Sequence, residues 1–223
     1  MNIALFGGTF DPIHAGHLRA ARVAARKFRL DKILFVPSGN PPHKLTNHLT
    51  AFHHRFSMVA LACAGEPKFI PSLLEAPKAD GRLHYSIATT ERVKRSLKPK
   101  DHLFFLLGLD AFLDLPHWKE YRRLFDLVDF IVVSRPGFSN SEFTRIVPPN
   151  LVREGKSNPG PDTIPLRKST LHILRGVDVP VASRKILDAI RARRPVAGLV
   201  PPLVEEYIWK EGLYRPGRTG KAE

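Results

Sequence analysis

The sequence predicts a doubly wound α/β fold, in which helices cover both faces of a parallel sheet. Residues 2–6 form a short apolar run that is typical of a buried strand, and residues 33–36 form a second one that ends at Pro37. Between them, from Gly16 onward, apolar residues recur three and four positions apart, as on the buried face of a helix. A strand, a helix and a second strand in this order form a βαβ unit, whose crossover makes the two strands parallel.

The alternation of strands and helices continues along the chain, at least four times in all, and this repetition favours a doubly wound sheet. Residues 38–50 are polar and are expected to form a loop. The helix expected at residues 86–97 begins with Ser86, a residue type that is favoured at the N-cap. The other elements expected in this part are helices at 51–64 and around 121–124, and strands at 69–70, 102–107 and 128–133.

The last third of the chain is less regular. Residues 137–168 are rich in proline and glycine, so they are expected to form a loop or a weakly structured insertion. Residues 170–174 are expected to form a last strand. Two helices are expected after it, at 181–193 and at 201–210, where the second ends before Gly212.

With 223 residues, the chain is long enough to bury a sizeable core within one domain. We expect a single domain over residues 1–214, whose C-terminal helical part covers 181–214, and a flexible tail at 215–223. The single cysteine, Cys63, excludes an intramolecular disulfide and fits a reducing, cytoplasmic location. No apolar run approaches the ~20 residues that cross a bilayer, and the N-terminus lacks the pattern of a signal peptide, so no membrane partner is expected.

The chain carries 35 Lys and Arg residues against 21 Asp and Glu residues, which gives a formal net charge of +14. Such a charge favours anionic partners, and these include both nucleic acids and small phosphorylated molecules. The basic residues are scattered rather than grouped, and the sequence contains no recognised nucleic-acid-binding motif. Charge by itself therefore leaves both kinds of partner open.

The most specific chemical signal is the segment from Gly7 to His17, which follows the first expected strand. The two glycines at its start, Gly7 and Gly8, let the backbone approach a ligand closely. The helix that starts near Gly16 offers free N–H groups and the positive end of its dipole to a phosphate. His14 and His17 are three residues apart at that helix start, so they can face the same point and donate hydrogen bonds to phosphoryl oxygens.

Two other interpretations of this segment stay open at this point. Gly7 and Gly8 are also typical of a tight turn whose histidines merely cap a helix. A metal site at His14 and His17 is the other alternative, but the neighbouring sequence lacks a carboxylate or cysteine at a usual zinc spacing. Neither standard glycine fingerprint for nucleotides, Gly-x-Gly-x-x-Gly or Gly-Lys-Ser/Thr, is present.

Residues 7–18, with the sequence GGTFDPIHAGHL, resemble the signature of the HxGH nucleotidyltransferase superfamily. Within it, the chain is most similar to the bacterial nicotinate-nucleotide adenylyltransferases. Further segments occur in the same order as in that family, and the resemblance extends over residues 1–214. These segments are 41–44 (PPHK), 85–87 (YSI), 108–110 (GLD), 115–118 (LPHW), 133–137 (VSRPG) and the C-terminal segment 199–214.

The resemblance implies a reaction in which the phosphate of nicotinate mononucleotide attacks the α-phosphorus of ATP, giving nicotinate adenine dinucleotide and pyrophosphate in NAD biosynthesis. Mg²⁺ is the implied cofactor, bound with ATP and bridging its phosphates. The implied catalytic residues are His14 and His17, which stabilise charge on the phosphates. The implied ATP-binding residues are Gly7, Gly8, Thr9, Phe10, His14, His17, Gly108, Asp110, Arg135, Ser183 and Arg184. The implied mononucleotide-binding residues are His43, Lys44, Tyr85, Ser86 and Trp118.

Several of these roles compete with simpler ones. Asp110 would accept hydrogen bonds from the ribose hydroxyls of ATP, although a helix cap predicts the same residue. Trp118 would stack on the pyridine ring, although tryptophan is also typical of a core. Ser86 would bind the nicotinate end, and an N-cap role competes with this. Arg135 would lie at the ligand-binding edge of the sheet and Lys44 would meet a substrate phosphate, each against a plain surface role.

The chain departs from the family pattern in two places. The family usually has a Ser-Ser-Thr-x-Ile-Arg-like segment at the start of a C-terminal helix. This chain keeps Ser183 and Ile186 there, but it has Ala182, Arg184 and Leu187 in place of the first serine, the threonine and the arginine. The acidic residue that commonly follows the Tyr-Ser segment is also missing. These changes put ATP affinity, turnover and substrate choice in question.

Three hypotheses follow from the sequence. The first is adenylyl transfer to nicotinate mononucleotide, with small molecules as partners and neither nucleic acid nor a membrane. The second keeps the fold but has another phosphorylated acceptor or a weakened activity. The third, which the net charge of +14 favours, is a nucleic-acid-binding protein. The oligomeric state is left open, a homo-oligomer included.

Overall fold

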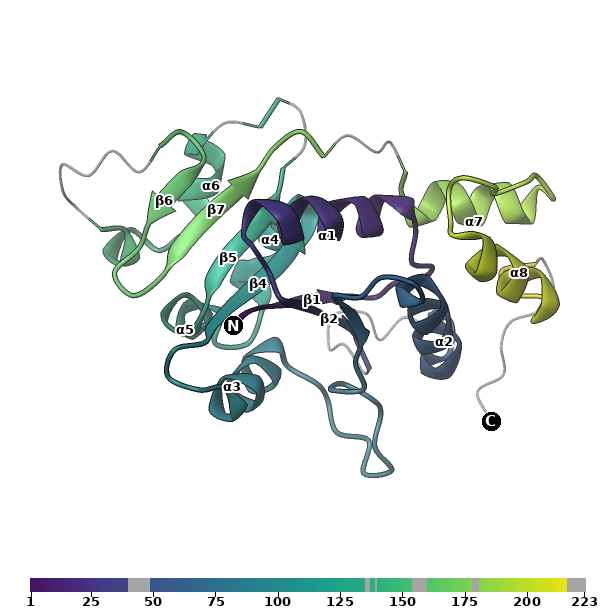
Figure 1. The fold of residues 1–223 in the computed structure, drawn as a ribbon, viewed down its shortest axis with the longest axis horizontal. Coiled ribbons are helices and arrows are strands. Elements are labelled where there is room, and N and C mark those ends of the chain that lie inside the picture. Colours follow the sequence, from purple (N-terminus) through teal and green to yellow (C-terminus); the bar gives the residue numbers. More distant parts are fainter. Residues whose placement is uncertain (40–48, 135–136, 139, 154–159, 178–180, 216–223) are drawn as a thin grey trace.

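The computed structural model describes residues 1–39, 49–134, 137–138, 140–153, 160–177 and 181–215. Its centre is a seven-stranded sheet with the strand order β3-β2-β1-β4-β5-β7-β6 (Figure 1). Neighbouring strands run parallel except for β6 and β7, which are antiparallel. The strands are β1 (Asn2–Gly8), β2 (Lys32–Pro37), β3 (Phe69–Pro71), β4 (His102–Gly108), β5 (Asp129–Val133), β6 (Thr163–Pro165) and β7 (Thr170–Leu174).

The winding of the chain reverses between β1 and β4, because β1 pairs with β2 on one side and with β4 on the other. Gly8 aligns with Pro37, and Gly108 aligns with Val133, so the carboxyl ends of these four strands lie at one edge of the sheet. Open α/β sheets bind ligands in the crevice at such a switch point. The predicted doubly wound sheet is confirmed, and it fixes where a ligand site is expected.

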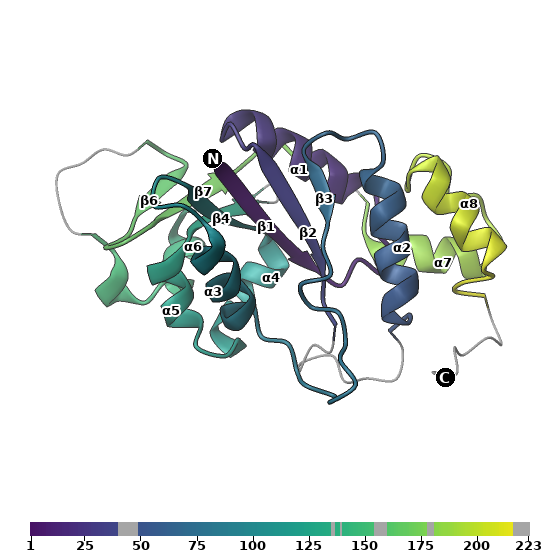
Figure 2. The ribbon, with the colours of Figure 1, turned by 60° about the horizontal axis from the view of Figure 1, so that its bottom comes forward.

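Alternate residues of β1 face two separate cores, because successive side chains of a strand point to opposite faces of the sheet. Ala4 and Phe6 face the first core, whereas Ile3 and Leu5 face the second. Helices cover both cores (Figure 2). The first core is covered by α1 (Ala15–Lys27), α2 (Phe52–Cys63), α7 (Ser183–Arg191) and α8 (Pro202–Lys210). The second is covered by α3 (Ser86–Ser96), α4 (Leu109–Leu113), α5 (Tyr121–Leu127) and α6 (Asn140–Ile146).

The segment 137–168 is more structured than its composition predicts. It contains α6, β6 and a short 3-10 helix, η2 (Pro149–Leu151). Phe143, Val147 and Ile164 from this segment are buried in the second core. The expectation of a loop or weakly structured insertion is wrong for these parts, because the prolines and glycines that the structure describes here lie at or outside the ends of short elements rather than within them.

Other predicted elements differ in detail. The helix α4 and the 3-10 helix η1 (Leu115–His117) were not expected. The prediction of Ser86 as an N-cap is wrong by one residue, because the helical backbone of α3 already includes Ser86, and Tyr85 holds the extended N-cap position (φ −116°, ψ 134°). Among the described helices, none is long and apolar enough to cross a membrane.

Replacing Phe143 with alanine tests whether α6 belongs to the core. The ring of Phe143 is 1% exposed and lies 5.7 Å from the ring of Phe112, measured between centroids. We therefore expect the free energy of unfolding to fall by about 3–5 kcal/mol. Leu203→Ala, at a position of α8 that is 49% exposed, is the control and should stay within about 0.5 kcal/mol of the wild type. Chemical denaturation measures both, and equal effects of the two changes would place α6 outside the folded core.

Candidate active site

A cavity of about 620 Å³ opens at the switch point between β1 and β4. Its wall joins the loop after β1 and the starts of α1, α3, α4 and α7. The described residues that the sequence predicts for substrate binding line this cavity, with the exception of Arg184. They are Gly7, Gly8, Thr9, Phe10, His14, His17, Tyr85, Ser86, Gly108, Asp110, Trp118 and Ser183.

Three predicted residues, His43, Lys44 and Arg135, lie outside the described residues, so their roles stay predictions. Arg184 lies on the exposed side of the first turn of α7. Its neighbour Ser183 does line the cavity, and the hydroxyl of Ser183 donates a hydrogen bond to the carbonyl of Pro12 at 3.2 Å. The start of α7 is thereby attached to the loop after β1.

The loop after β1 turns sharply around the ring of Phe10. This residue has a left-handed backbone (φ 48°), and its side chain is 2% exposed. A Cβ on Gly8 would lie 3.1 Å from the ring, so glycine allows the backbone to pass this close. The ring packs edge-on against Phe6 and His17, at centroid distances of 5.6 and 5.0 Å. The close turn therefore places Phe10 directly against His17.

His14 and His17 stand together at the start of α1, in the N-cap and N3 positions. Their rings stack with centroids 3.7 Å apart and an angle of 22° between the planes. The backbone N–H of His14 donates a hydrogen bond to Nδ1 of His17 at 3.3 Å. Because Nδ1 accepts this bond, the neutral ring of His17 carries its proton on Nε2, which is then a hydrogen-bond donor.

Both imidazoles are neutral at physiological pH. Burial lowers the pKa of His14 to about 4. Burial, together with the repulsion that a protonated His14 would exert on a second cation, lowers the pKa of His17 well below its usual value. The first turn of α1, which the structure describes in full, has no acidic residue. The start of α1 therefore offers an anion N–H dipoles and the positive end of a helix, rather than a fixed positive charge.

Another part of the wall is aromatic. Trp118 packs edge-on against Phe105, with centroids 6.0 Å apart, and its indole Nε1 donates to a carboxylate oxygen of Asp114 at 3.3 Å. Nζ of Lys119 lies 4.4 Å from the ring centre of Tyr85. These contacts hold the indole of Trp118 in place where it lines the cavity, which suits stacking on a flat ring.

Three polar residues on the wall, Glu75, His84 and Thr89, were not predicted from the sequence. The Glu75 side chain is buried and accepts a hydrogen bond from Oγ1 of Thr89 at 2.9 Å, and burial raises its pKa. A Cβ on Gly39 would lie 1.9 Å from the carbonyl oxygen of Glu75, so only glycine fits there. Spacing offers no signal for these contacts, because they form through the long connection between β3 and α3, which has no regular period.

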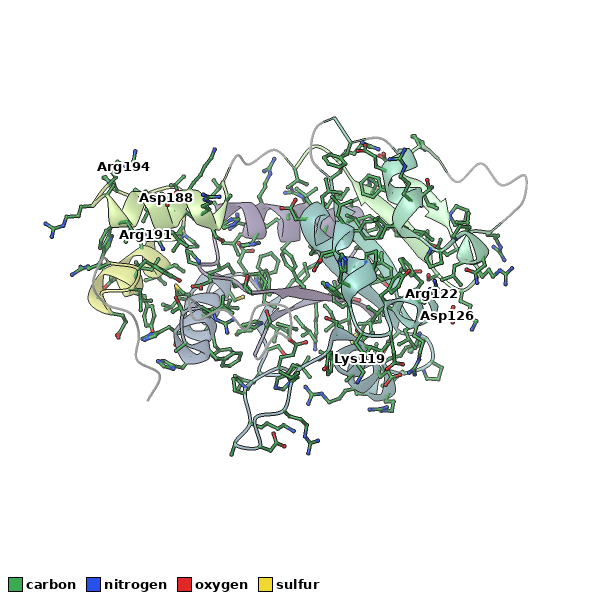
Figure 3. All side chains as sticks on the ribbon, turned by 180° about the vertical axis from the view of Figure 1, so that it is seen from behind. Lys119, Arg122, Asp126, Asp188, Arg191 and Arg194 are labelled. Atoms are coloured by element: carbon green, nitrogen blue, oxygen red, sulfur yellow. The ribbon has the colours of Figure 1, made fainter. Side chains whose placement is uncertain are left out.

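Among the described residues, little of the positive charge that gives the chain its net charge of +14 lies at the cavity. Among the described residues of its wall, Lys119 is the one lysine or arginine. Other cationic side chains lie far apart on the molecule, with Arg191 and Arg194 near the end of α7 and Arg122 on α5 (Figure 3). The positive charge is thus spread over the surface.

Comparison with known proteins agrees with this geometry. The cytidylyltransferase-like family model matches residues 5–192. A probable nicotinate-nucleotide adenylyltransferase from Solibacter usitatus is 37% identical over 214 residues, which cover 96% of this chain and 100% of the relative. One from Desulfatibacillum aliphaticivorans is 35% identical over 221 residues, with the same coverage of both chains.

The chain belongs to the nicotinate-nucleotide adenylyltransferase family. This membership confirms the resemblance seen at residues 7–18. Among solved structures, that of Plasmodium falciparum nicotinic acid mononucleotide adenylyltransferase complexed with NaAD matches with a TM-score of 0.69 at 20% identity, and it covers 96% of this chain and 97% of the other. At that identity, the likeness concerns the fold alone.

In this member of the family, the buried neutral state of His14 predicts a pH-dependent stability. The pKa of His14 is about 4 in the folded protein, against 6.5 without the fold, so the unfolded chain binds more protons between these values. The free energy of unfolding should therefore fall as the pH drops from 6.5 towards 4. Above pH 6.5, His14 is neutral in both states, and its lowered pKa costs no stability. We expect His14→Gln to reduce the fall, by at most about 3 kcal/mol at the acid end.

Urea denaturation of wild type and His14→Gln at several pH values between 4 and 8 measures this difference. A wild-type curve steeper than that of the variant below pH 6.5 supports a buried, neutral His14. Curves of equal slope would show that His14 takes up its proton equally in the folded and unfolded chains.

Proposed function

We propose that this protein transfers the adenylyl group of ATP to nicotinate mononucleotide, giving nicotinate adenine dinucleotide and pyrophosphate in NAD biosynthesis. The family supports this reaction. In the chain itself, the observation that carries the proposal is the pair His14 and His17 at the start of α1, facing the cavity at the switch point of the sheet. A phosphate placed there can accept hydrogen bonds from the N–H of Gly16, in the first turn of the helix, and from the imidazole donors.

The mechanism depends on positioning and on charge stabilisation. The attacking phosphate of the mononucleotide is already ionised near neutral pH, so it needs no strong general base. As it attacks the α-phosphorus of ATP, negative charge is spread over the phosphoryl oxygens. The Nε2–H of His17 and the N-terminus of α1 can donate hydrogen bonds to these oxygens. A neutral imidazole makes this contribution as a donor, without giving up its proton.

The other wall residues suit the two substrates. We assign the ribose hydroxyls of ATP to Asp110, in the first turn of α4, because a carboxylate accepts hydrogen bonds from both hydroxyls of a diol. We assign the pyridine ring to the indole of Trp118, and the nicotinate end to Tyr85 and Ser86 at the start of α3. Lys44 keeps its predicted contact with a substrate phosphate.

Mg²⁺ is expected to arrive with ATP. Among the residues that the structure describes, no group of three or more His, Cys, Asp or Glu side chains could hold an ion. Phosphate oxygens and water, which Mg²⁺ prefers, would then be its main ligands, and the ion would neutralise part of the triphosphate charge. We place the reaction in the cytoplasm, which suits the buried free thiol of Cys63, with small-molecule substrates and no nucleic-acid partner.

Replacing His17 with alanine removes the proposed donor to the transition state. We expect kcat to fall by about 100- to 1,000-fold, as for the loss of a comparable hydrogen-bond donor, while the protein stays folded. Pyrophosphate release from ATP, nicotinate mononucleotide and Mg²⁺ measures the rate. His102→Ala, at an exposed position at the start of β4 and thus at the opposite edge of the sheet, is the control and should keep the wild-type rate. Near-normal turnover of a folded His17→Ala would refute the role.

Arg184→Thr introduces the residue type that the family usually has at this position. We expect turnover to stay the same or to rise, because Arg184 lies outside the cavity wall. The KM for ATP and kcat are compared with those of Lys185→Thr, which removes the same charge from the neighbouring exposed position. A large loss confined to Arg184→Thr would show that this arginine has taken over a phosphate contact.

A different phosphorylated acceptor is the second candidate function, and the altered residues Ala182 and Arg184 are the observation that favours it. The reaction is tested by supplying nicotinate mononucleotide, nicotinamide mononucleotide and phosphopantetheine in parallel, each with ATP and Mg²⁺. We expect nicotinate mononucleotide to give the highest kcat/KM. Pyrophosphate release with another acceptor but none with nicotinate mononucleotide would replace the proposed function.

A further inference from the structure

The guanidinium of Arg55, on α2, is buried beside the loop after β1, and the mechanism above makes no use of it. Its side chain is 2% exposed; burial lowers its pKa, whereas Asp11 and Tyr214 raise it. Nε donates a hydrogen bond to the carbonyl of Thr50, and Nη1 donates one to the carbonyl of Thr9, both at 2.8 Å. Burying a charge is costly unless its hydrogen bonds are made, so these two bonds are the first sign of a role.

The carboxylate of Asp11 makes two further hydrogen bonds near Arg55. It accepts one from the hydroxyl of Tyr214 at 2.6 Å and one from the backbone N–H of Thr50 at 3.0 Å. Burial and the charge of Asp11 raise the pKa of Tyr214, so its hydroxyl stays protonated and continues to donate. Three segments that are distant in the sequence, residues 9–11, residues 50–55 and Tyr214, therefore meet at the loop after β1.

These contacts fix the two residues on either side of Phe10. Thr9 is held through its carbonyl, and Asp11 is held through its carboxylate. Phe10, between them, has a left-handed backbone, and its ring centre lies 5.0 Å from that of His17. A shift of either neighbour would move this ring. The hydrogen bonds of Arg55 and Asp11 therefore affect the position of the His17 imidazole through the side chain of Phe10.

We propose that Arg55 and Asp11 are positioning residues for adenylyl transfer, which hold Phe10 against His17 and thereby fix the direction of the His17 donor. The reaction in this inference rests on the proposed function. Arginine suits the position because its planar guanidinium donates from Nε and Nη1 to carbonyls of two segments, whereas a lysine ammonium is a point charge. The loss should appear in kcat rather than in binding, because the donor acts on charge that develops in the transition state.

Arg55→Lys tests this, since it keeps a positive charge near Asp11 but not the two-carbonyl geometry. We expect kcat to fall by about 10- to 100-fold, with the KM values of both substrates within about 3-fold of the wild type. Val59→Ala is the matched control, because Val59 lies one turn further along α2, is 0% exposed and packs in the same core. Val59→Ala should lower the midpoint temperature of unfolding and leave kcat unchanged. Both variants are assayed well below their own midpoint temperatures.

The ring ¹⁵N signals of His17 provide a second measurement that needs no acceptor. We expect Arg55→Lys to shift them and Val59→Ala to leave them at their wild-type positions. Should Arg55→Lys fail to fold, Tyr214→Phe removes only the hydroxyl that donates to Asp11 and is expected to show the same changes in smaller measure.

A wild-type kcat in the folded Arg55 variant, an equal loss in Val59→Ala, or unchanged His17 signals would each overturn the positioning role. If the wild-type protein releases no pyrophosphate with nicotinate mononucleotide, the proposed function fails instead. The His17 signals would then still decide whether Arg55 and Asp11 orient this imidazole.

Discussion

The backbone N–H groups at the start of α1 are the feature on which the rest of the site depends, because the first N–H groups of a helix have no partner within it. An acidic side chain in the first turn would offset their partial positive charge, and α1 has none there. The N–H of Ala15 donates to the carbonyl of Leu199 at 2.8 Å, whereas the next two residues, Gly16 and His17, line the cavity of about 620 Å³ where β1 ends in Gly7 and Gly8. An anionic ligand in this cavity can accept hydrogen bonds from this part of the helix, and the parallel sheet, the glycine turn and the two histidines all serve to position it.

At the start of α1, oriented dipoles rather than fixed positive charges line the cavity. His14 and His17 are buried and neutral, whereas Arg191 and Arg194 lie on the surface near the end of α7 (Figure 3). The net charge of +14 belongs to the whole surface, where its long-range field aids the capture of anionic substrates. The buried donors act over a few ångströms, where they can favour the transition state over the bound substrate.

Local signals made the central sheet and the glycine–histidine segment predictable. Residues 102–107 are a nearly continuous apolar run, and the segment 7–17 is contiguous in the sequence. By contrast, α4 is five residues long, too short to show a helical period. Arg55 contacts Thr9 across 46 residues, and it lies in a helix that is otherwise largely apolar, so no spacing could indicate its role. Tertiary contacts of this kind decide how the predicted motif is held, and only the folded chain shows them.

The ring ¹⁵N signals of His14 and His17, recorded at pH 7 without and with ATP, test most directly whether neutral imidazoles hold the phosphates. We predict neutral rings in the free protein, with the proton of His17 on Nε2, and a shift of that nitrogen when ATP binds. Rings that are already cationic in the free protein, or His17 signals that ATP leaves unchanged, would contradict this mechanism.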